Sequence, residues 1–368
     1  MNKINMSIRI ILTFMGALFF TTPLLGNDDP WLLFRHAEDV VAGEVVQILK
    51  EERDLLYLLT DGNTGNPYQV TDVKWWREPE GSGTEGIGVQ VGTRGAWLVA
   101  TVSEEEFPIQ VSTLLPRGFL RMNDFTQIDD LRMILQKRTA TAAALRLLDS
   151  KDSEVRRVAI GWWKSCPVDV AVKHREAIEE KFTTEPDPGC QRSYLSLYLM
   201  RDWTFGGAGI SELIPYSPDG TVSWLTLQYL KKKGSPQQRA RLMSSWIVSD
   251  DMAREKIAIA FRVLKMREAH PWLLKAAIES KGSFRNTCLE ALASTCDENN
   301  MNTLTSLLDS DCIQTRAAIL RGLARSGSTG SHKLLENQVN TLHISDPLFD
   351  TARALQKNPR RSLLRVGE

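Results

Sequence analysis

One position recurs every 31 residues along the C-terminal part of the chain, and we call this set of positions the ladder. Its positions are occupied by Arg192, Ser223, Arg254, Arg285 and Arg316. Apolar residues follow each ladder position by three or four residues and again by seven, which is the spacing of one face of an α-helix. A period near thirty with helical spacing inside each copy indicates stacked helical hairpins, because one hairpin cannot bury its own apolar face.

An earlier copy lies outside this constant spacing. Residues 147–156 read Leu-Leu-Asp-Ser-Lys-Asp-Ser-Glu-Val-Arg, and residues 307–316 read Leu-Leu-Asp-Ser-Asp-Cys-Ile-Gln-Thr-Arg. In both, Arg follows the Asp by seven residues. The pattern resembles the HEAT-repeat family, in the short form of the phycobilin lyase-like repeats, over residues 130–357. The resemblance implies an α-solenoid, but not the lyase activity, since such a scaffold serves unrelated functions.

The ladder divides this region into about seven predicted helical hairpins. Residues 204–209, which include three glycines, predict an irregular loop and a shortened helix in the third hairpin. We expect the first helices near 130–148, 168–182, 209–214, 235–248, 268–280, 300–308 and 330–342. We expect the second helices near 153–164, 190–201, 221–232, 251–265, 283–294, 312–325 and 346–357.

The arginines that begin the second helices are expected to be structural, because they recur at the packing register. Their guanidinium groups are expected to donate hydrogen bonds to turn carbonyls or to an Asp of the adjacent repeat. The Asp in the turn is expected to cap the second helix with its carboxylate. The residues assigned to this scaffold are Arg156, Arg192, Arg254, Arg285, Arg316, Asp149 and Asp309.

Residues 1–26 predict an export signal. Lys3 and Arg9 accompany an apolar run over residues 10–20, and Gly26 supplies a small residue for cleavage. An uncleaved N-terminal anchor is the alternative. Cleavage leaves 43 basic and 45 acidic side chains, a formal charge of −2, which argues against a nucleic-acid partner. We expect an exported protein, periplasmic or extracellular, with no membrane span after cleavage.

Residues 27–115 predict a small β-domain. Clusters of Gly, Pro and Asn separate runs that are rich in β-forming residues, which favours an antiparallel β-barrel or sandwich. The domain is similar to the OB- or netrin-like barrels that precede repeats in some exported bacterial proteins. The similarity rests on Gly43, the run at 68–76 and the segment 92–98. The predicted strands cover residues 39–48, 55–59, 68–76, 95–102 and 107–111.

Two segments flank the predicted repeats. Residues 116–129 contain Pro116 and Gly118 and predict a linker. Residues 358–368 are basic and predict a disordered tail.

The residues that usually carry chemistry are scattered. No histidine is followed by Glu, no two histidines lie three or four residues apart, and no nucleophile or phosphate-loop motif occurs. The five cysteines are odd in number and include no CxxC pair, which favours buried free thiols over disulfides or a zinc site. The sequence therefore predicts no enzyme, no cofactor and no metal.

The exposed surface of the second helices is expected to line the concave face of the superhelix, which is the usual binding face of such arrays. Its chemistry is mixed, which suits a protein partner better than a uniform polyanion, and Trp224 is the best anchor. The alternative is a glycan or cell surface bound by the β-domain through Trp75 or Trp76. The candidate contact residues lie one and five positions after the ladder: Arg157, Trp224, Gln228, Glu255, Asn286, Glu290 and Arg321.

The sequence thus predicts an α+β multidomain protein. A small antiparallel β-barrel or sandwich precedes an α-solenoid of HEAT-like hairpins, and the whole is a non-catalytic interaction protein.

Overall fold

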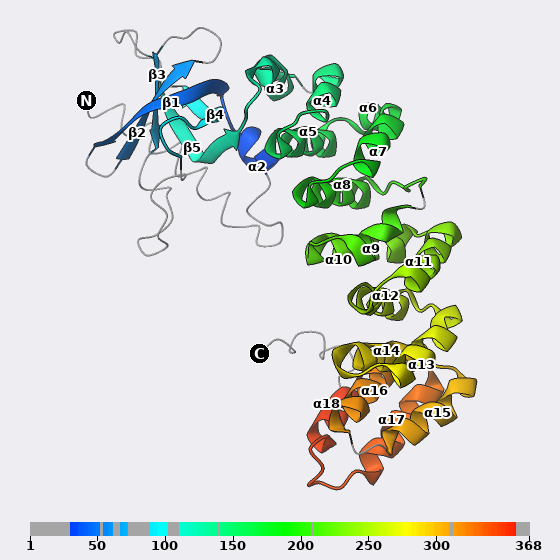
Figure 1. Ribbon diagram of the computed structural model, residues 1–368. Helices are drawn as coiled ribbons and strands as arrows, with labels where there is room; N and C mark the ends of the chain where they lie inside the picture. The colour runs from blue at the N-terminus through cyan, green and yellow to red at the C-terminus, as the bar shows by residue number, and fades with distance from the viewer. Residues whose placement is uncertain are drawn as a thin grey trace. The chain divides into compact units, whose positions relative to one another are not determined.

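The computed structural model divides the chain into two compact units, residues 1–201 and 202–368 (Figure 1). Among the described residues, strands occur in the first unit and helices in both, so the expected α+β class is confirmed. The division falls inside the predicted repeat region rather than at residues 116–129. The structure describes residues 30–51, 54–61, 67–72, 89–101, 110–137, 140–207, 209–309 and 312–357.

Five strands form the β-domain, one for each predicted run. β1 pairs antiparallel with β2 and β4, β2 pairs with β3 and β4 with β5, giving the closed order β1-β2-β3-β5-β4. The β3–β5 pair is parallel, with Tyr68 opposite Gln110, so the expectation of an entirely antiparallel sheet is wrong there. The strands are β1 (Asp39–Glu51), β2 (Asp54–Asp61), β3 (Pro67–Asp72), β4 (Arg94–Thr101) and β5 (Gln110–Arg121).

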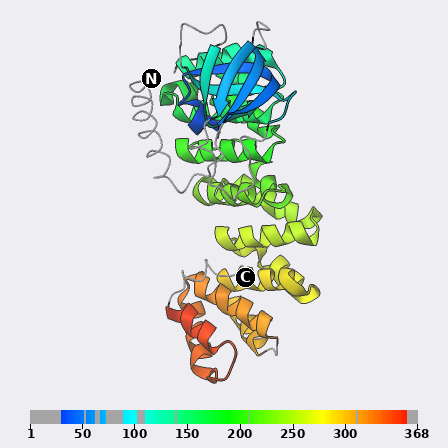
Figure 2. The same ribbon diagram turned by 90° about the vertical axis from the view of Figure 1, so that its left-hand side faces the viewer.

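Trp97 belongs to the buried core of the β-domain, whose strands face the viewer in Figure 2. The ring of Tyr57 lies 5.2 Å from the Trp97 ring, and that of Phe119 lies 4.7 Å away. A Cβ atom on Gly95 would lie 2.1 Å from the Phe119 ring, so only glycine lets the two strands approach this closely. The other buried members of the core are Val41, Val45, Tyr57, Leu59, Val70 and Val99.

The linker expected over residues 116–129 is regular structure instead. Strand β5 continues to Arg121, and a short 3-10 helix, η2 (Phe125–Gln127), leads directly into the first α-helix of the repeat region. Pro116 and Gly118 lie where the pairing of β5 with β4 shifts register. Such an irregularity accommodates Pro and Gly inside a strand.

The remaining helices of the first unit follow the predicted hairpins, with two corrections. The helix expected over 130–148 is two helices, α3 (Ile128–Gln136) and α4 (Thr141–Leu147). The helix expected over 168–182 is also two, α6 (Val168–Lys173) and α7 (Arg175–Thr183). The second helices, α5 (Ser153–Ser165) and α8 (Pro188–Arg201), lie where the pattern places them and pack against each other.

A short helix before the strands, α2 (Pro30–Phe34), packs on α5. Trp31 lies so close to Gly161 that a Cβ atom there would come within 2.0 Å of the Trp31 Cβ. The contact ties the start of the described chain to the first repeat helices rather than to the β-domain alone.

The described residues of the second unit form helices joined by turns. Its second helices α10, α12, α14 and α16 pack on one another in sequence order, as Figure 1 shows from green to orange. They are α10 (Gly220–Lys233), α12 (Asp251–Leu264), α14 (Gly282–Ser294) and α16 (Ile313–Ser326). The shorter elements around them are η3 (Gly209–Glu212), α9 (Leu213–Tyr216), α11 (Pro236–Val248), η4 (Arg267–Ala269), α13 (His270–Glu279), α15 (Glu298–Leu308), α17 (Thr329–Thr341) and α18 (Phe349–Lys357).

Side chains in the turns explain several helix starts. Asp219 and Asp250 each accept hydrogen bonds from the first turn of the helix that follows, and Ser235 forms a capping box with Gln238 before α11. The apolar positions predicted from the ladder are buried, except Leu199, which is half-buried. The fully buried ones include Leu195, Leu230, Ile257, Phe261, Leu289, Leu292, Ile319 and Leu323.

Several expectations concern residues outside the described part of the chain. They are the export signal at 1–26, the tail at 358–368, and the pair Trp75 and Trp76. None of the described helices combines the length and the apolarity needed to cross a membrane.

Candidate functional site

The ladder residues lie in the first turns of the second helices. Arg156 is the fourth residue of α5 and donates to both carboxylate oxygens of Glu185 at 2.7 and 2.9 Å. It also donates to the carbonyl of Ser150 at 2.8 Å. One buried guanidinium group therefore joins a turn to the hairpin that follows it.

The same position in the second unit makes equivalent contacts. Arg254 donates to the carbonyl of Trp246 at 3.0 Å, and Ser223 donates to the carbonyl of Ile214 at 3.1 Å. Arg316 donates to Asp346 at 2.7 Å, and this hydrogen bond lowers the pKa of the Asp346 carboxyl. Arg254 and Ser223 thus bind the end of the helix that precedes their own, whereas Arg316 reaches the segment between α17 and α18. The remaining ladder arginines, Arg192 and Arg285, are half-buried in α8 and α14.

The capping role expected for Asp149 and Asp309 is wrong. Asp149 is exposed and forms an ion pair with Lys181 at 2.6 Å, while α5 begins after Asp152. Asp309 is exposed, and α16 begins after Cys312. Both aspartates lie three residues before the capping position, too far along the turn to reach the first amides of the helix.

Trp224 remains the strongest candidate on the exposed surface of the second helices. It lies on α10 with 56% of its surface exposed, and Gln228 lies one helical turn further on. Glu255 accepts hydrogen bonds from Thr287 at 2.9 Å and Ser283 at 3.4 Å. Arg157 and Asn286 are half-buried.

Two of the predicted contact residues belong to an internal ion-pair cluster instead. Glu290, on α14, is only 7% exposed and was expected on the exposed surface of the second helices. Arg321, on α16, donates its Nε to Glu290 at 3.1 Å. The position five residues after the ladder lies between neighbouring second helices here, so these two side chains meet each other rather than solvent.

Two further arginines complete the cluster. Arg262 of α12 and Arg325 of α16 both form ion pairs with the same Glu290 oxygen. The side chains of Arg262 and Arg325 are each 19% exposed, and that of Arg321 is 28% exposed. Helices α12 and α16 thus place three guanidinium groups around one carboxylate of α14.

The arginines of this cluster have lowered pKa values. Burial lowers the pKa of all three, and the charge of Arg321 lowers that of Arg262 further. Burial and then the charge of Arg262 lower the pKa of Arg325 to about 10. Burial is the main cause for each arginine, and repulsion by a neighbouring guanidinium group adds to it for Arg262 and Arg325.

Sequence reasoning missed Arg262 and Arg325. Both lie in the last turn of a second helix, eight and nine residues after the ladder position. A signal existed, because charged residues of opposite sign occur on the same helix face in three consecutive copies, at the positions eight and nine residues after the ladder as well as five.

A cavity of about 360 Å³ opens at the C-terminal ends of the same three helices. Its charged lining residues are Lys265 and Arg267, and Lys265 donates to the carbonyl of Ser326 at 2.7 Å. Hydroxyl groups supply most of the remaining lining. The other lining residues are Ser294, Thr295, Cys296, Ser326, Gly327 and Ser328.

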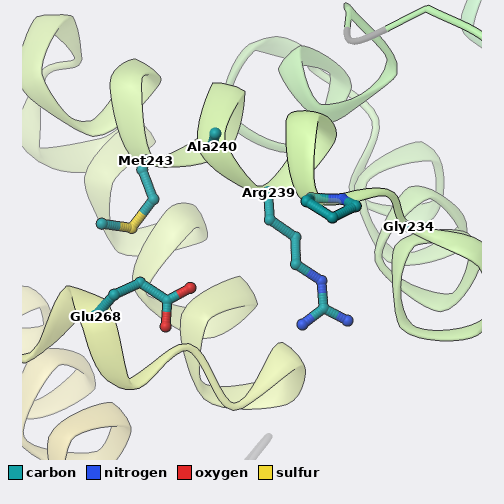
Figure 3. A pocket seen from close by; sticks show the side chains of 6 residues that line it. Gly234, Arg239, Ala240, Met243 and Glu268 are labelled. Carbon is teal, nitrogen blue, oxygen red and sulfur yellow. The ribbon is translucent and has the colours of Figure 1, made fainter.

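A second cavity, of about 630 Å³, lies between α11 and η4. Figure 3 shows Arg239 and Met243 from α11 projecting into the same space as Glu268 from η4. Ala240 and Pro236 supply apolar walls. Its lining brings no nucleophile next to a general base, so it suits binding rather than chemistry.

The described residues hold no group of three or more His, Cys, Asp or Glu side chains arranged for a metal ion. None of the five cysteines forms a disulfide, and only Cys312 is exposed. Burial raises the pKa of the Cys190, Cys288 and Cys296 thiols, which makes them inert at neutral pH.

Comparison with known proteins adds no assignment. No family model matches the sequence, and no curated protein matches it.

Proposed function

We propose that the chain is an exported, non-catalytic interaction protein that binds a protein partner through the concave face of its solenoid, which the exposed surface of the second helices would line. The periodic ladder and the packing of α10, α12, α14 and α16 in sequence order support a HEAT-like α-solenoid. The strand order β1-β2-β3-β5-β4, with β3 parallel to β5, is similar to that of an OB-like barrel and supports such a domain before the repeats.

The single observation that carries the proposal is the exposure of Trp224. A tryptophan with 56% of its surface in solvent, on a helix whose other aromatic residue, Tyr229, is buried, is the type of side chain that dominates binding energy at protein interfaces. Gln228 lies beside it on the same helix and provides an adaptable polar contact.

A photo-crosslinking amino acid tests this surface. We place it at position 228 on α10, and in a control variant at the exposed Lys275 on α13. The first is expected to give one dominant protein adduct in envelope and secreted fractions of the native host. Trp224→Ala is expected to abolish that adduct.

Two results would contradict the proposal. One is the same set of adducts from both positions, and the other is an adduct from position 228 that survives Trp224→Ala. Far-UV circular dichroism checks that Trp224→Ala retains its helices. Arg321 is not changed in this test, because it holds Glu290 inside the protein.

A further inference from the structure

The Arg262–Glu290–Arg321–Arg325 cluster carries a surplus of positive charge. Three guanidinium groups share one carboxylate, and no other acidic side chain of the described residues forms an ion pair with them. The surplus is therefore two positive charges in a half-buried site. Charges that are withdrawn from water without a partner are costly, so a site of this kind favours an anion that completes it.

Few hydrogen-bond donors of the cluster have a partner among the described residues. A guanidinium group has five N–H donors; Arg262 and Arg321 each donate one hydrogen bond to Glu290, and Arg325 forms an ion pair with it. The Nε of Arg325 is buried and has no hydrogen-bond partner among the described residues. The remaining donors suit the planar, paired geometry in which arginine binds phosphate and carboxylate oxygens.

The cavity of about 360 Å³ lies at the C-terminal ends of the helices that carry this cluster. Lys265 follows Arg262 by three residues, Ser294 follows Glu290 by one helical turn, and Ser326 is the neighbour of Arg325. The cavity adds the cations Lys265 and Arg267 and a set of hydroxyl groups. A small polar molecule with a charged group at one end matches this combination in size and chemistry.

We propose that the arginine cluster binds a phosphate-class oxyanion, either inorganic phosphate or the phosphoryl group of a small ester whose remaining part occupies the adjoining cavity. A phosphoryl group carries close to two negative charges at neutral pH and offers three acceptor oxygens. One phosphoryl group therefore neutralises both surplus positive charges, whereas a single carboxylate of a protein partner neutralises only one of them. This inference does not depend on the proposed protein partner.

Calorimetric titration of the full chain with sodium phosphate at pH 7.5 and constant ionic strength tests the proposal. We expect saturable binding of one phosphate. Arg325→Gln is expected to weaken it by roughly ten- to a hundredfold, since one charge-assisted hydrogen-bonding group is lost. The matched control is Arg241→Gln on α11, because Arg241 has one carboxylate, Glu212, to itself and is more exposed.

The outcomes are distinct. The absence of saturable phosphate binding, or equal binding by Arg325→Gln and the unaltered chain, overturns the site. If circular dichroism shows that Arg325→Gln is unfolded, hydrogen exchange of the unaltered chain with and without phosphate decides. Phosphate must then slow exchange in α12, α14 and α16, and no slowing there overturns the site.

Two further titrations identify the source of the oxyanion. If glycerol 2-phosphate binds more tightly than phosphate, and if Arg267→Ser removes this difference in affinity, the ligand is an ester. Equal affinities support inorganic phosphate. Binding of hexaglutamate in the absence of any phosphate binding overturns the assignment in favour of an acidic peptide.

Discussion

Gly322 allows α16 to approach α14 at the level of the arginine cluster, and its replacement tests this packing. A Cβ atom at position 322 would lie 2.5 Å from the Glu290 carbonyl oxygen and 2.6 Å from the Ala293 Cβ, whereas ordinary contacts begin at 3.4 Å. In Gly322→Ala the two helices must therefore separate by roughly 0.9 Å, an overpacking that costs about 1–3 kcal/mol. Alanine returns up to about 1 kcal/mol through its higher helix propensity. We expect a net loss of about 1–2 kcal/mol.

Hydrogen exchange measured by mass spectrometry reports this loss locally. Amides of α14 and α16 are expected to exchange roughly five to thirty times faster in Gly322→Ala, with no change in the strands. Gly330→Ala on α17 is the matched control, because its Cβ would meet only the flexible end of Met301 at 3.2 Å. We expect equal or slower exchange in the control. Unchanged or slower exchange of α16 in Gly322→Ala would refute the close approach as the reason for this glycine.

The cluster and a buried histidine give the remaining predictions. In phosphate-free buffer, Glu290→Gln is expected to lower the free energy of unfolding by about 3 kcal/mol or more, because it leaves three half-buried cations unpaired. Arg325→Gln is expected to lower it by about 1 kcal/mol or less, because the change also relieves repulsion. Urea unfolding measures both losses, and equal losses would contradict the charge surplus. Burial lowers the pKa of His270, whose Nε2 lies 2.7 Å from the Thr295 hydroxyl. The unfolded chain therefore binds the proton more readily, and stability is expected to fall as the pH drops below about 6.5. His270→Gln should flatten this fall in urea midpoints between pH 7.5 and 5.0, and His343→Gln, at an exposed position, should leave it in place.

The helices of the second unit were predictable because their turns carry explicit signals. Ser235 before a proline and Asp250 before α12 mark helix starts, and the apolar residues after each ladder position mark the buried face. The breaks between α3 and α4 and between α6 and α7 were missed. Neither break is marked by a glycine or proline in the sequence, at residues 137–140 or at His174, so no signal in the sequence predicted it.

Contacts between residues far apart in the sequence determine the features that the sequence pattern did not predict. The parallel pairing of β3 with β5 depends on the path of the chain between them, and alternation of apolar residues does not encode strand direction. Glu290 illustrates the same limit for the site. Its position after the ladder predicts exposure, but the absence of a side chain at Gly322 brings α16 close enough to cover it.

The ratio of acids to arginines separates the scaffold from the candidate ligand site. Arg156 and Arg316 each have one carboxylate from the hairpin that follows, so their charges are matched and a ligand would have to displace an existing partner. Around Glu290 the ratio is three arginines to one acid, and a ligand adds contacts without displacing any. A dianion therefore gains more free energy at the Glu290 cluster than at any matched pair, because only there does binding remove an electrostatic cost that the unliganded fold already carries.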